Sequence, residues 1–136
     1  MTRRFRGFVK SKNRWIFGWY IETKDGSAII SDISSWVDGS EWCIEDFDFV
    51  ERESVGQCAD LRDQNGKEIY PHDIVEYKVE IGGDIKIERG EVIFDEGGYC
   101  VDKYYISNWL ISLINNEKLM DFRVIGDTYT TPELLD

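Results

Sequence analysis

The sequence is poor in the residues that most often carry enzyme chemistry or covalent cross-links. Its 136 residues include one histidine, two prolines and three cysteines. With His72 alone, one chain cannot supply a histidine-centred triad or a two-histidine metal motif. Cys43, Cys58 and Cys100 are widely spaced and form no CxxC pair. We therefore expect three cytosolic thiols, each acting as a small buried apolar side chain.

Common catalytic motifs are also missing. No GxSxG, HExxH, Walker or GxGxxG pattern occurs. The 27 acidic residues are so numerous that a glycosidase-like pair of carboxylates cannot be singled out. The EDFDF run at residues 45–49 is a candidate for binding a divalent cation, but it lacks the ligand and glycine spacing of an EF-hand, and a solvated acidic face is favoured. We expect no enzyme activity, no cofactor and no metal site.

Long hydrophobic runs are absent as well. None approaches the roughly 20 apolar residues that cross a bilayer, and no apolar stretch follows the basic N-terminal residues as a secretory signal would require. The content of 42% hydrophobic and 14% aromatic residues argues against disorder. We expect a folded, cytoplasmic protein without membrane contact.

Charge is divided unevenly along a chain whose formal net charge is −11. The first 20 residues contain no acidic residue, whereas residues 21–60 contain eleven acidic residues against two basic ones. The basic residues of this N-terminal segment are Arg3, Arg4, Arg6, Lys10, Lys12 and Arg14. The segment either pairs with the acidic surface of its own chain or binds nucleic acid as a basic arm. Self-pairing is favoured, because the acidic body would repel phosphates.

Alternating apolar residues predict an antiparallel meander in the first half of the chain. Residues 15–22 (WIFGWYIE) are apolar on both faces, which is typical of a central strand covered on both sides. A turn at residues 24–26 leads into a partner strand at residues 27–33. Residues 36–50 mix aromatic side chains with carboxylates, and we expect strand and loop there with a solvated acidic face.

A hairpin and a long ribbon are predicted next. Asn65-Gly66 suits the positive φ angles of a type I′ turn between residues 61–63 and 68–70. Pro71 indicates a corner, with His72 beside it in an exposed turn. Residues 74–81 then alternate between apolar and charged side chains, Gly82-Gly83 turns the chain, and residues 85–94 return it as the second strand of a ribbon. A tight hairpin followed by a proline-marked corner also occurs in small SH3-like barrels.

Helical periodicity appears at residues 107–115. Apolar residues at i, i+3, i+4, i+7 and i+8 predict one short helix that includes Trp109 and Leu113. A short strand at residues 99–101 precedes it and a final strand at residues 122–129 follows. The predicted fold is mainly β with one short helix: an antiparallel meander plus an SH3-like, partly closed barrel. The chain is one domain, with candidate subdomains at residues 1–54 and 55–136.

An ordered set of short motifs resembles the YopX family. The motifs are FRGF near the start, VGQ, NGKEIY and DIV in the middle, and VIGDTYTTPELL at the end. The chain departs from the family pattern at Cys58-Ala59-Asp60, where an aromatic residue, Thr and Gly are usual, and at Pro71-His72, where Glu-Gly is usual. The resemblance implies a small protein of bacterial phages and prophages, and it assigns no catalytic residue.

Two classes of function remain in view. The favoured one is a non-enzymatic protein that acts by protein contact, either in a homo-oligomer or by binding a host or phage protein through its acidic surface. Its interface candidates are Trp15, Trp19, Trp109 and Leu113, because aromatic residues are enriched in interface cores. The alternative is single-stranded nucleic-acid binding by the basic segment, with the stripe of Trp15, Phe17 and Trp19 as a stacking platform. Such a stripe is more often part of a core.

Overall fold

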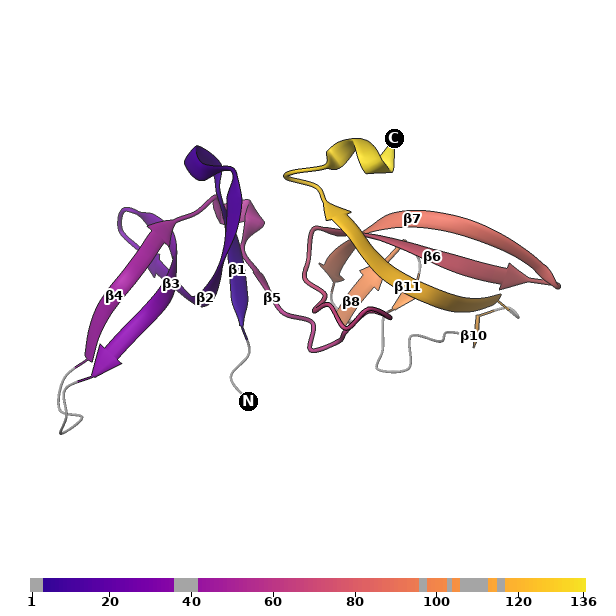
Figure 1. Ribbon diagram of the computed structural model, residues 1–136, viewed down its shortest axis with the longest axis horizontal. Helices are drawn as coiled ribbons and strands as arrows, with labels where there is room; N and C mark the ends of the chain where they lie inside the picture. The colour runs from indigo at the N-terminus through magenta and orange to yellow at the C-terminus, as the bar shows by residue number, and fades with distance from the viewer. Residues whose placement is uncertain (1–3, 36–41, 96–97, 103, 106–112, 115–116) are drawn as a thin grey trace. The chain divides into compact units, whose positions relative to one another are not determined.

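The computed structural model describes residues 4–35, 42–95, 98–102, 104–105, 113–114 and 117–136 (Figure 1). The chain divides into two compact units, Met1–Gln57 (unit 1) and Cys58–Asp136 (unit 2). Each unit holds one antiparallel sheet, so the prediction of a mainly β fold is confirmed.

Unit 1 contains a five-stranded sheet in the order β4-β3-β2-β1-β5. Its strands are β1 (Phe5–Val9), β2 (Arg14–Thr23), β3 (Gly26–Ser35), β4 (Trp42–Phe49) and β5 (Gly56–Gln57). Two short 3-10 helices, η1 (Lys10–Lys12) and η2 (Arg52–Ser54), lie before β2 and before β5. The meander predicted from the alternation of apolar residues is therefore present as β2, β3 and β4.

Strand β2 pairs with two neighbours in turn. It pairs with β1 as far as Gly18, which lies opposite Phe5, and with β3 from Trp19 onward, which lies opposite Ile30. Gly18 has a φ angle of +157°, and a Cβ atom there would lie 2.0 Å from the carbonyl oxygen of Ile30. Only a glycine permits so close an approach of two strands.

One face of this sheet carries a small core. The buried residues are Val9, Ile16 and Ile29, and Phe5, Tyr20 and Val50 pack against them. Helix η2 is tied to β1 by Ser54, whose hydroxyl oxygen accepts a hydrogen bond of 2.7 Å from the N–H of Phe8. The opposite face of the sheet is described below as the candidate site.

Unit 2 contains a six-stranded sheet in the order β10-β11-β6-β7-β8-β9. Its elements are β6 (Asp73–Ile81), β7 (Asp84–Asp95), β8 (Gly98–Val101), β9 (Tyr104–Tyr105), β10 (Leu113–Ile114), β11 (Glu117–Asp127) and the 3-10 helix η3 (Pro132–Leu135). The predicted ribbon is confirmed as β6 and β7. Within the described residues, the sheet is open and does not close into a barrel.

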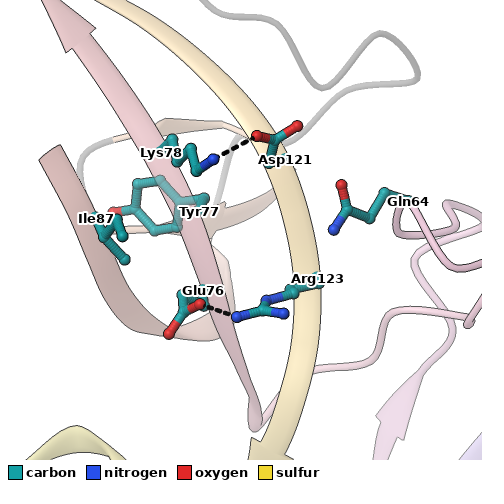
Figure 2. A pocket seen from close by; sticks show the side chains of 7 residues that line it. All are labelled: Gln64, Glu76, Tyr77, Lys78, Ile87, Asp121 and Arg123. Carbon is teal, nitrogen blue, oxygen red and sulfur yellow. Dashed lines mark hydrogen bonds and ion pairs between the residues drawn. The ribbon is translucent and has the colours of Figure 1, made fainter. Parts of the chain in front are cut away.

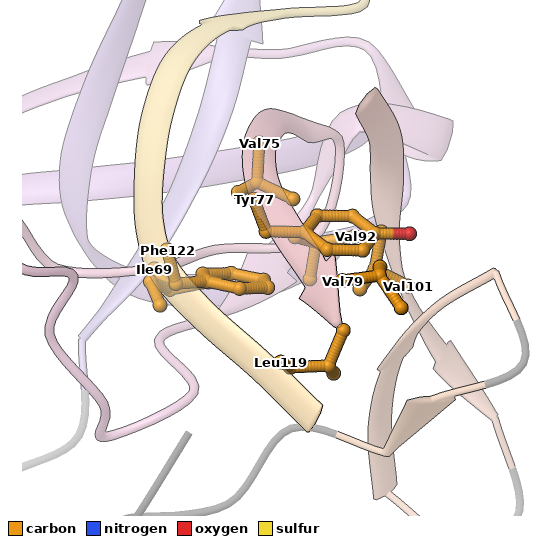
Figure 3. Packing of buried hydrophobic residues seen from close by; sticks show 8 residues of the cluster. All are labelled: Ile69, Val75, Tyr77, Val79, Val92, Val101, Leu119 and Phe122. Atoms are coloured by element: carbon orange, nitrogen blue, oxygen red, sulfur yellow. The ribbon is translucent and has the colours of Figure 1, made fainter. Parts of the chain in front are cut away.

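The core of unit 2 lies on one face of this sheet (Figure 3). The ring of Tyr77 stacks on that of Phe122, with centroids 5.6 Å apart. The hydroxyl group of Tyr77 donates a hydrogen bond to Asp102. The buried members of the cluster are Ile69, Val75, Tyr77, Val79, Val92, Val101, Leu119 and Phe122.

The hairpin after β5 forms, but its turn differs from the prediction. The N–H of Asp63 donates to the carbonyl of Lys67 at 2.9 Å, and Gly66 has a φ angle of +83°. Asn65 is not among the described residues with positive φ, so the type I′ assignment was wrong. The Asp63 carboxylate accepts the N–H groups of Asn65 and Lys67, each at 2.9 Å. This side chain supports a turn in which Gly66 alone is left-handed.

The C-terminal motif is organised by a second buried carboxylate. Asp127 accepts hydrogen bonds from the N–H groups of Tyr129 and Thr130, at 2.9 and 2.8 Å. A Cβ atom on Gly126 would lie 2.1 Å from the hydroxyl oxygen of Thr131. The turn that follows β11 therefore folds tightly back on the strand before η3 begins.

The predicted helix at residues 107–115 falls largely outside the described residues, as do Trp109 and Arg3. The exception is Leu113–Ile114, which forms β10 and pairs with Lys118 and Glu117 of β11. These two residues are strand rather than helix, because pairing with a neighbouring strand outweighs local apolar periodicity. The final strand was predicted at residues 122–129, whereas β11 already begins at Glu117.

Candidate interaction surface

The face of β2, β3 and β4 opposite the unit 1 core is apolar. The strand register forms one row of Trp19, Ile30 and Phe47 and a second row of Ile21, Ala28 and Phe49. Residues directly opposite each other in an antiparallel pair project to the same face. In agreement with this, the rings of Phe47 and Phe49 meet edge to face with centroids 5.6 Å apart. We call the exposed members of this face the aromatic face: Phe17, which alternates with Trp19 in β2, Trp19, Ile21, Phe47 and Phe49.

The side chains of the aromatic face lie in solvent. They are between 38% and 49% exposed, whereas Ala28 and Ile30 between them are buried. The prediction that β2 is covered on both sides was therefore wrong for the face that carries Phe17, Trp19 and Ile21. Soluble monomers rarely leave large contiguous apolar patches in water, so a patch of this kind indicates an interaction site.

Two carboxylates of β4 project to the opposite face. Asp46 and Asp48 alternate with the two phenylalanines of β4, and Asp48 lies opposite the core residue Ile29. Lys12 forms an ion pair with Asp48, with 3.0 Å between Nζ and Oδ1. Pairing of the basic segment with acidic residues of its own chain predicts an ion pair of this kind.

Glu22 belongs to the core face too. It accepts hydrogen bonds from the hydroxyl groups of Ser27, at 2.6 Å, and Tyr20. The Ser27 hydrogen bond, followed by that of Tyr20, lowers the pKa of Glu22, and the Glu22 carboxylate raises the pKa of Tyr20. Polar contacts and carboxylates thus gather on the core face.

The basic N-terminal residues that the structure describes do not form one patch. The exposed Arg4 places its guanidinium carbon 5.4 Å from the ring centroid of Phe17. Arg6 is buried, 5% exposed, and lies over the ring of Trp15 at 3.8 Å. The exposed residues at and beside η1 are Lys10, Lys12 and Arg14. The structure therefore separates the five candidate nucleic-acid contacts that it describes into stacked arginines and a basic turn.

Sequence reasoning found only part of the aromatic face. Of the interface candidates, Trp19 belongs to it, whereas Trp15 is half-buried against Phe8. Phe47 and Phe49 were missed, because EDFDF was interpreted as an acidic face. The alternation of carboxylates and rings in this run could have revealed an apolar face, since successive residues of a strand project to opposite faces. No cluster that could hold a metal ion occurs among the described residues.

The cysteines and the histidine partly match their predictions. Cys58 and Cys100 are buried, and burial raises the pKa of both thiols. Cys43 is exposed on β4, so the prediction of burial was wrong there. His72 lies in the expected turn but is only partly exposed, with Nδ1 3.0 Å from a carboxylate oxygen of Glu91. Its ring meets that of Tyr129 edge to face, so the prediction of an exposed histidine was also wrong.

Unit 2 has a polar cavity of about 330 Å³ (Figure 2). Its four charged side chains form two ion pairs, Glu76 with Arg123 and Lys78 with Asp121. Arg89 also contacts Glu76, at 3.0 Å. The complete lining is Gln64, Glu76, Tyr77, Lys78, Ile87, Asp121 and Arg123. Because these charges satisfy one another, the cavity is a weaker candidate site than the aromatic face.

Replacing Glu76 by Gln should remove a pH-dependent part of the stability. Hydrogen bonds from Arg123 and then Arg89 lower the pKa of Glu76. A lowered pKa stabilises the fold above the unfolded-state value of about 4.3, and this stabilisation disappears as the pH falls through the folded-state value. Urea unfolding should show Glu76→Gln less stable than wild type by up to about 1 kcal/mol at pH 7, with a smaller difference at pH 3. The exposed Glu88→Gln is the control, and an equal loss at both pH values would contradict this account.

Taken together, the observations define a mainly β protein whose best candidate site is a sheet face rather than a catalytic pocket. The model of the family described as YopX protein matches residues 4–136. The chain belongs to the YopX family, as the ordered motifs predicted. No match was found among curated proteins.

A solved structure shares the fold. It is the crystal structure of protein EF1440 from Enterococcus faecalis, with a TM-score of 0.71 and 22% sequence identity. The alignment covers 100% of this chain and 99% of that chain. Within the residues described for our protein, no helix has the length and hydropathy that crossing a bilayer requires.

Proposed function

We propose that this YopX-family protein is a non-enzymatic protein of phage or prophage origin that acts in the bacterial cytoplasm by binding another protein. The aromatic face is the observation that carries the proposal. It presents five large apolar side chains on β2 and β4, the two strands that flank β3, and each is at least 38% exposed. No cofactor and no metal are part of the proposed activity.

The aromatic face has the chemistry of a protein interface core. Tryptophan and phenylalanine supply large contact areas, and charged residues are depleted at interface centres. The side chains lie on paired strands, so their positions are largely fixed before binding. A preformed surface loses less conformational entropy on association than a loop that must become ordered.

Single-stranded nucleic-acid binding is the second candidate, and one contact favours it. Arg4 stacks on Phe17 at the border of the aromatic face, and arginine beside exposed rings is a feature of single-strand binders. Two observations favour protein binding over it. Arg6 is buried, and Lys12 is already paired with Asp48. A nucleic-acid groove needs several accessible cations along the path of the phosphates.

Cross-linking in cells tests the proposed function. A photoactivatable phenylalanine analogue replaces Phe47, which is 49% exposed, in the bacterium that carries the gene. We expect protein adducts at position 47 and none with the same analogue at position 94, because Phe94 lies outside the aromatic face although it is 66% exposed. Absence of protein adducts, or adducts with nucleic acid alone, would overturn the proposal.

A further inference from the structure

Among the described strands, β4 lies at one edge of the unit 1 sheet and carries two of the exposed rings (Figure 1). An edge strand presents backbone N–H and C=O groups on the side where it has no neighbour. We propose that a partner protein adds an extended segment to β4 as an antiparallel strand, in which apolar residues alternate with lysine or arginine. This inference rests on the proposed function, because it names how the partner of the aromatic face binds and what its chemistry is.

The backbone groups that face this edge belong to Phe47 and Phe49. The N–H of Val50 donates to the carbonyl of Ser27 at 2.9 Å, so these two residues form a hydrogen-bonded pair. The register continues without a shift to Phe47, which lies opposite Ile30. In an antiparallel ladder, hydrogen-bonded pairs alternate with pairs whose backbone groups point away from each other. The N–H and C=O groups of Phe47 and Phe49 therefore point away from β3, where a further strand can reach them.

The side chains of β4 are divided by chemistry between the two faces of the sheet. Phe47 and Phe49 project to the aromatic face, whereas Asp46 and Asp48 project to the opposite face. A strand added to β4 would place every second side chain beside a ring and the others beside a carboxylate. Apolar residues suit the first positions and basic residues the second, because cross-strand pairs of opposite charge are favourable. Lys12, whose Nζ lies 3.0 Å from Asp48, shows that an ammonium group fits beside these carboxylates.

Charge favours a foreign basic segment over the β4 strand of a second copy. Strand β4 contains three carboxylates and no basic residue, in a chain whose net charge is −11. Two β4 strands that paired with each other would bring like charges together, which destabilises a strand pair. A basic segment would instead neutralise the carboxylates. Its backbone would also complete the hydrogen bonds of the edge, as in other complexes formed by strand addition.

A synthetic peptide of alternating lysine and valine, with the sequence KVKVKVK, tests the inference on the purified full-length chain. Amide hydrogen exchange, followed by NMR, would be measured with and without the peptide. The N–H groups of Phe47 and Phe49 should exchange at least about tenfold more slowly when the peptide is bound. The N–H of Asp48 already faces β3, so its exchange should change little.

Two modified peptides separate strand addition from attraction between charges. In the antiparallel arrangement, the valines lie opposite Phe47 and Phe49 and form the hydrogen-bonded pairs. N-methylation of the valines removes these donors and should weaken binding at least about tenfold. The N–H groups of the lysines point away from β4, so N-methylation of the lysines should leave the affinity almost unchanged.

A pair of protein variants tests the charge complementarity. Asp46→Lys places a like charge beside the lysines of the peptide and should weaken binding at least about fivefold. Asp84→Lys, at an exposed position of unit 2, makes the same change in net charge and is the matched control. It should weaken binding clearly less than Asp46→Lys does.

The inference would be overturned if the unmodified peptide did not bind, or if exchange at Phe47 and Phe49 were unchanged. It would also be overturned if methylation of the lysines weakened binding as much as methylation of the valines, or if the two protein variants behaved alike. If position 47 still forms protein adducts in cells while the peptide experiments fail, the proposed function stands and strand addition to β4 is refuted.

Discussion

Replacing Asp63 by Ala should lower the free energy of unfolding by about 3 kcal/mol, because it leaves several backbone N–H groups without a hydrogen-bond acceptor. The carboxylate is buried, 6% exposed. One oxygen accepts the N–H groups of Asn65 and Lys67, and the other accepts the N–H of Val124 at 2.8 Å. A single side chain thus holds the hairpin turn and joins it to β11, which is 61 residues away in the sequence.

Asp63→Asn is the informative companion, since it keeps the shape and one acceptor oxygen. It should lower the free energy of unfolding clearly less than Asp63→Ala does, as measured by urea unfolding. The amide oxygen still accepts hydrogen bonds from one set of N–H groups, whereas the NH₂ group faces the other N–H and cannot accept from it. Equal stability of Asp63→Ala and wild type would show that the three hydrogen bonds do not support the unit 2 fold.

Gly18→Ala is expected to cost at least about 3 kcal/mol, because backbone rather than a movable side chain blocks the new methyl group. The added Cβ would meet the carbonyl oxygen of Ile30 at 2.0 Å. Strand β2 would have to leave β3, and the aromatic face would lose its register. Hydrogen exchange of β2 and β3 amides should accelerate strongly in this variant, together with a fall in melting temperature.

Gly83→Ala provides the control for left-handed glycines in general. Gly83 has a φ angle of +91°, but a methyl group added there would have no atom within 4 Å. Its substitution should therefore cost only about 1 kcal/mol of conformational strain. If Gly18→Ala were as mild as Gly83→Ala, the close approach of β2 to β3 would not be what requires glycine at position 18.

Strands with strict alternation were predictable from sequence alone. Residues 74–81 became β6, because every second residue from Val75 to Ile81 is apolar, and Gly82-Gly83 supplies the reversal into residues 85–94, which became β7. The Asn65-Gly66 turn was placed correctly but given the wrong type, since the prediction ignored Asp63 two residues earlier. The Asp63 carboxylate makes local hydrogen bonds to the backbone two and four residues on, and the dipeptide alone does not reveal them.

The candidate site was only half predictable. Trp19 and its neighbours were recognised as an aromatic stripe, but the sequence pattern of such a stripe is the same whether its side chains lie in a core or on the surface. Exposure depends on what covers the sheet, which local sequence does not specify. Phe47 and Phe49 join Trp19 only through strand register, Trp19 to Ile30 and Ile30 to Phe47. Such long-range pairing is invisible when each segment of the sequence is considered alone.

Burial of the aromatic face in living cells tests the central claim most directly. Hydroxyl-radical labelling would compare Phe47 with Phe94, which are 49% and 66% exposed in the isolated chain. We predict that Phe47 is protected relative to Phe94 in cells and is more reactive in the dilute purified protein. A Phe47 to Phe94 labelling ratio that is the same in cells and in the dilute protein would contradict a protein contact at this face.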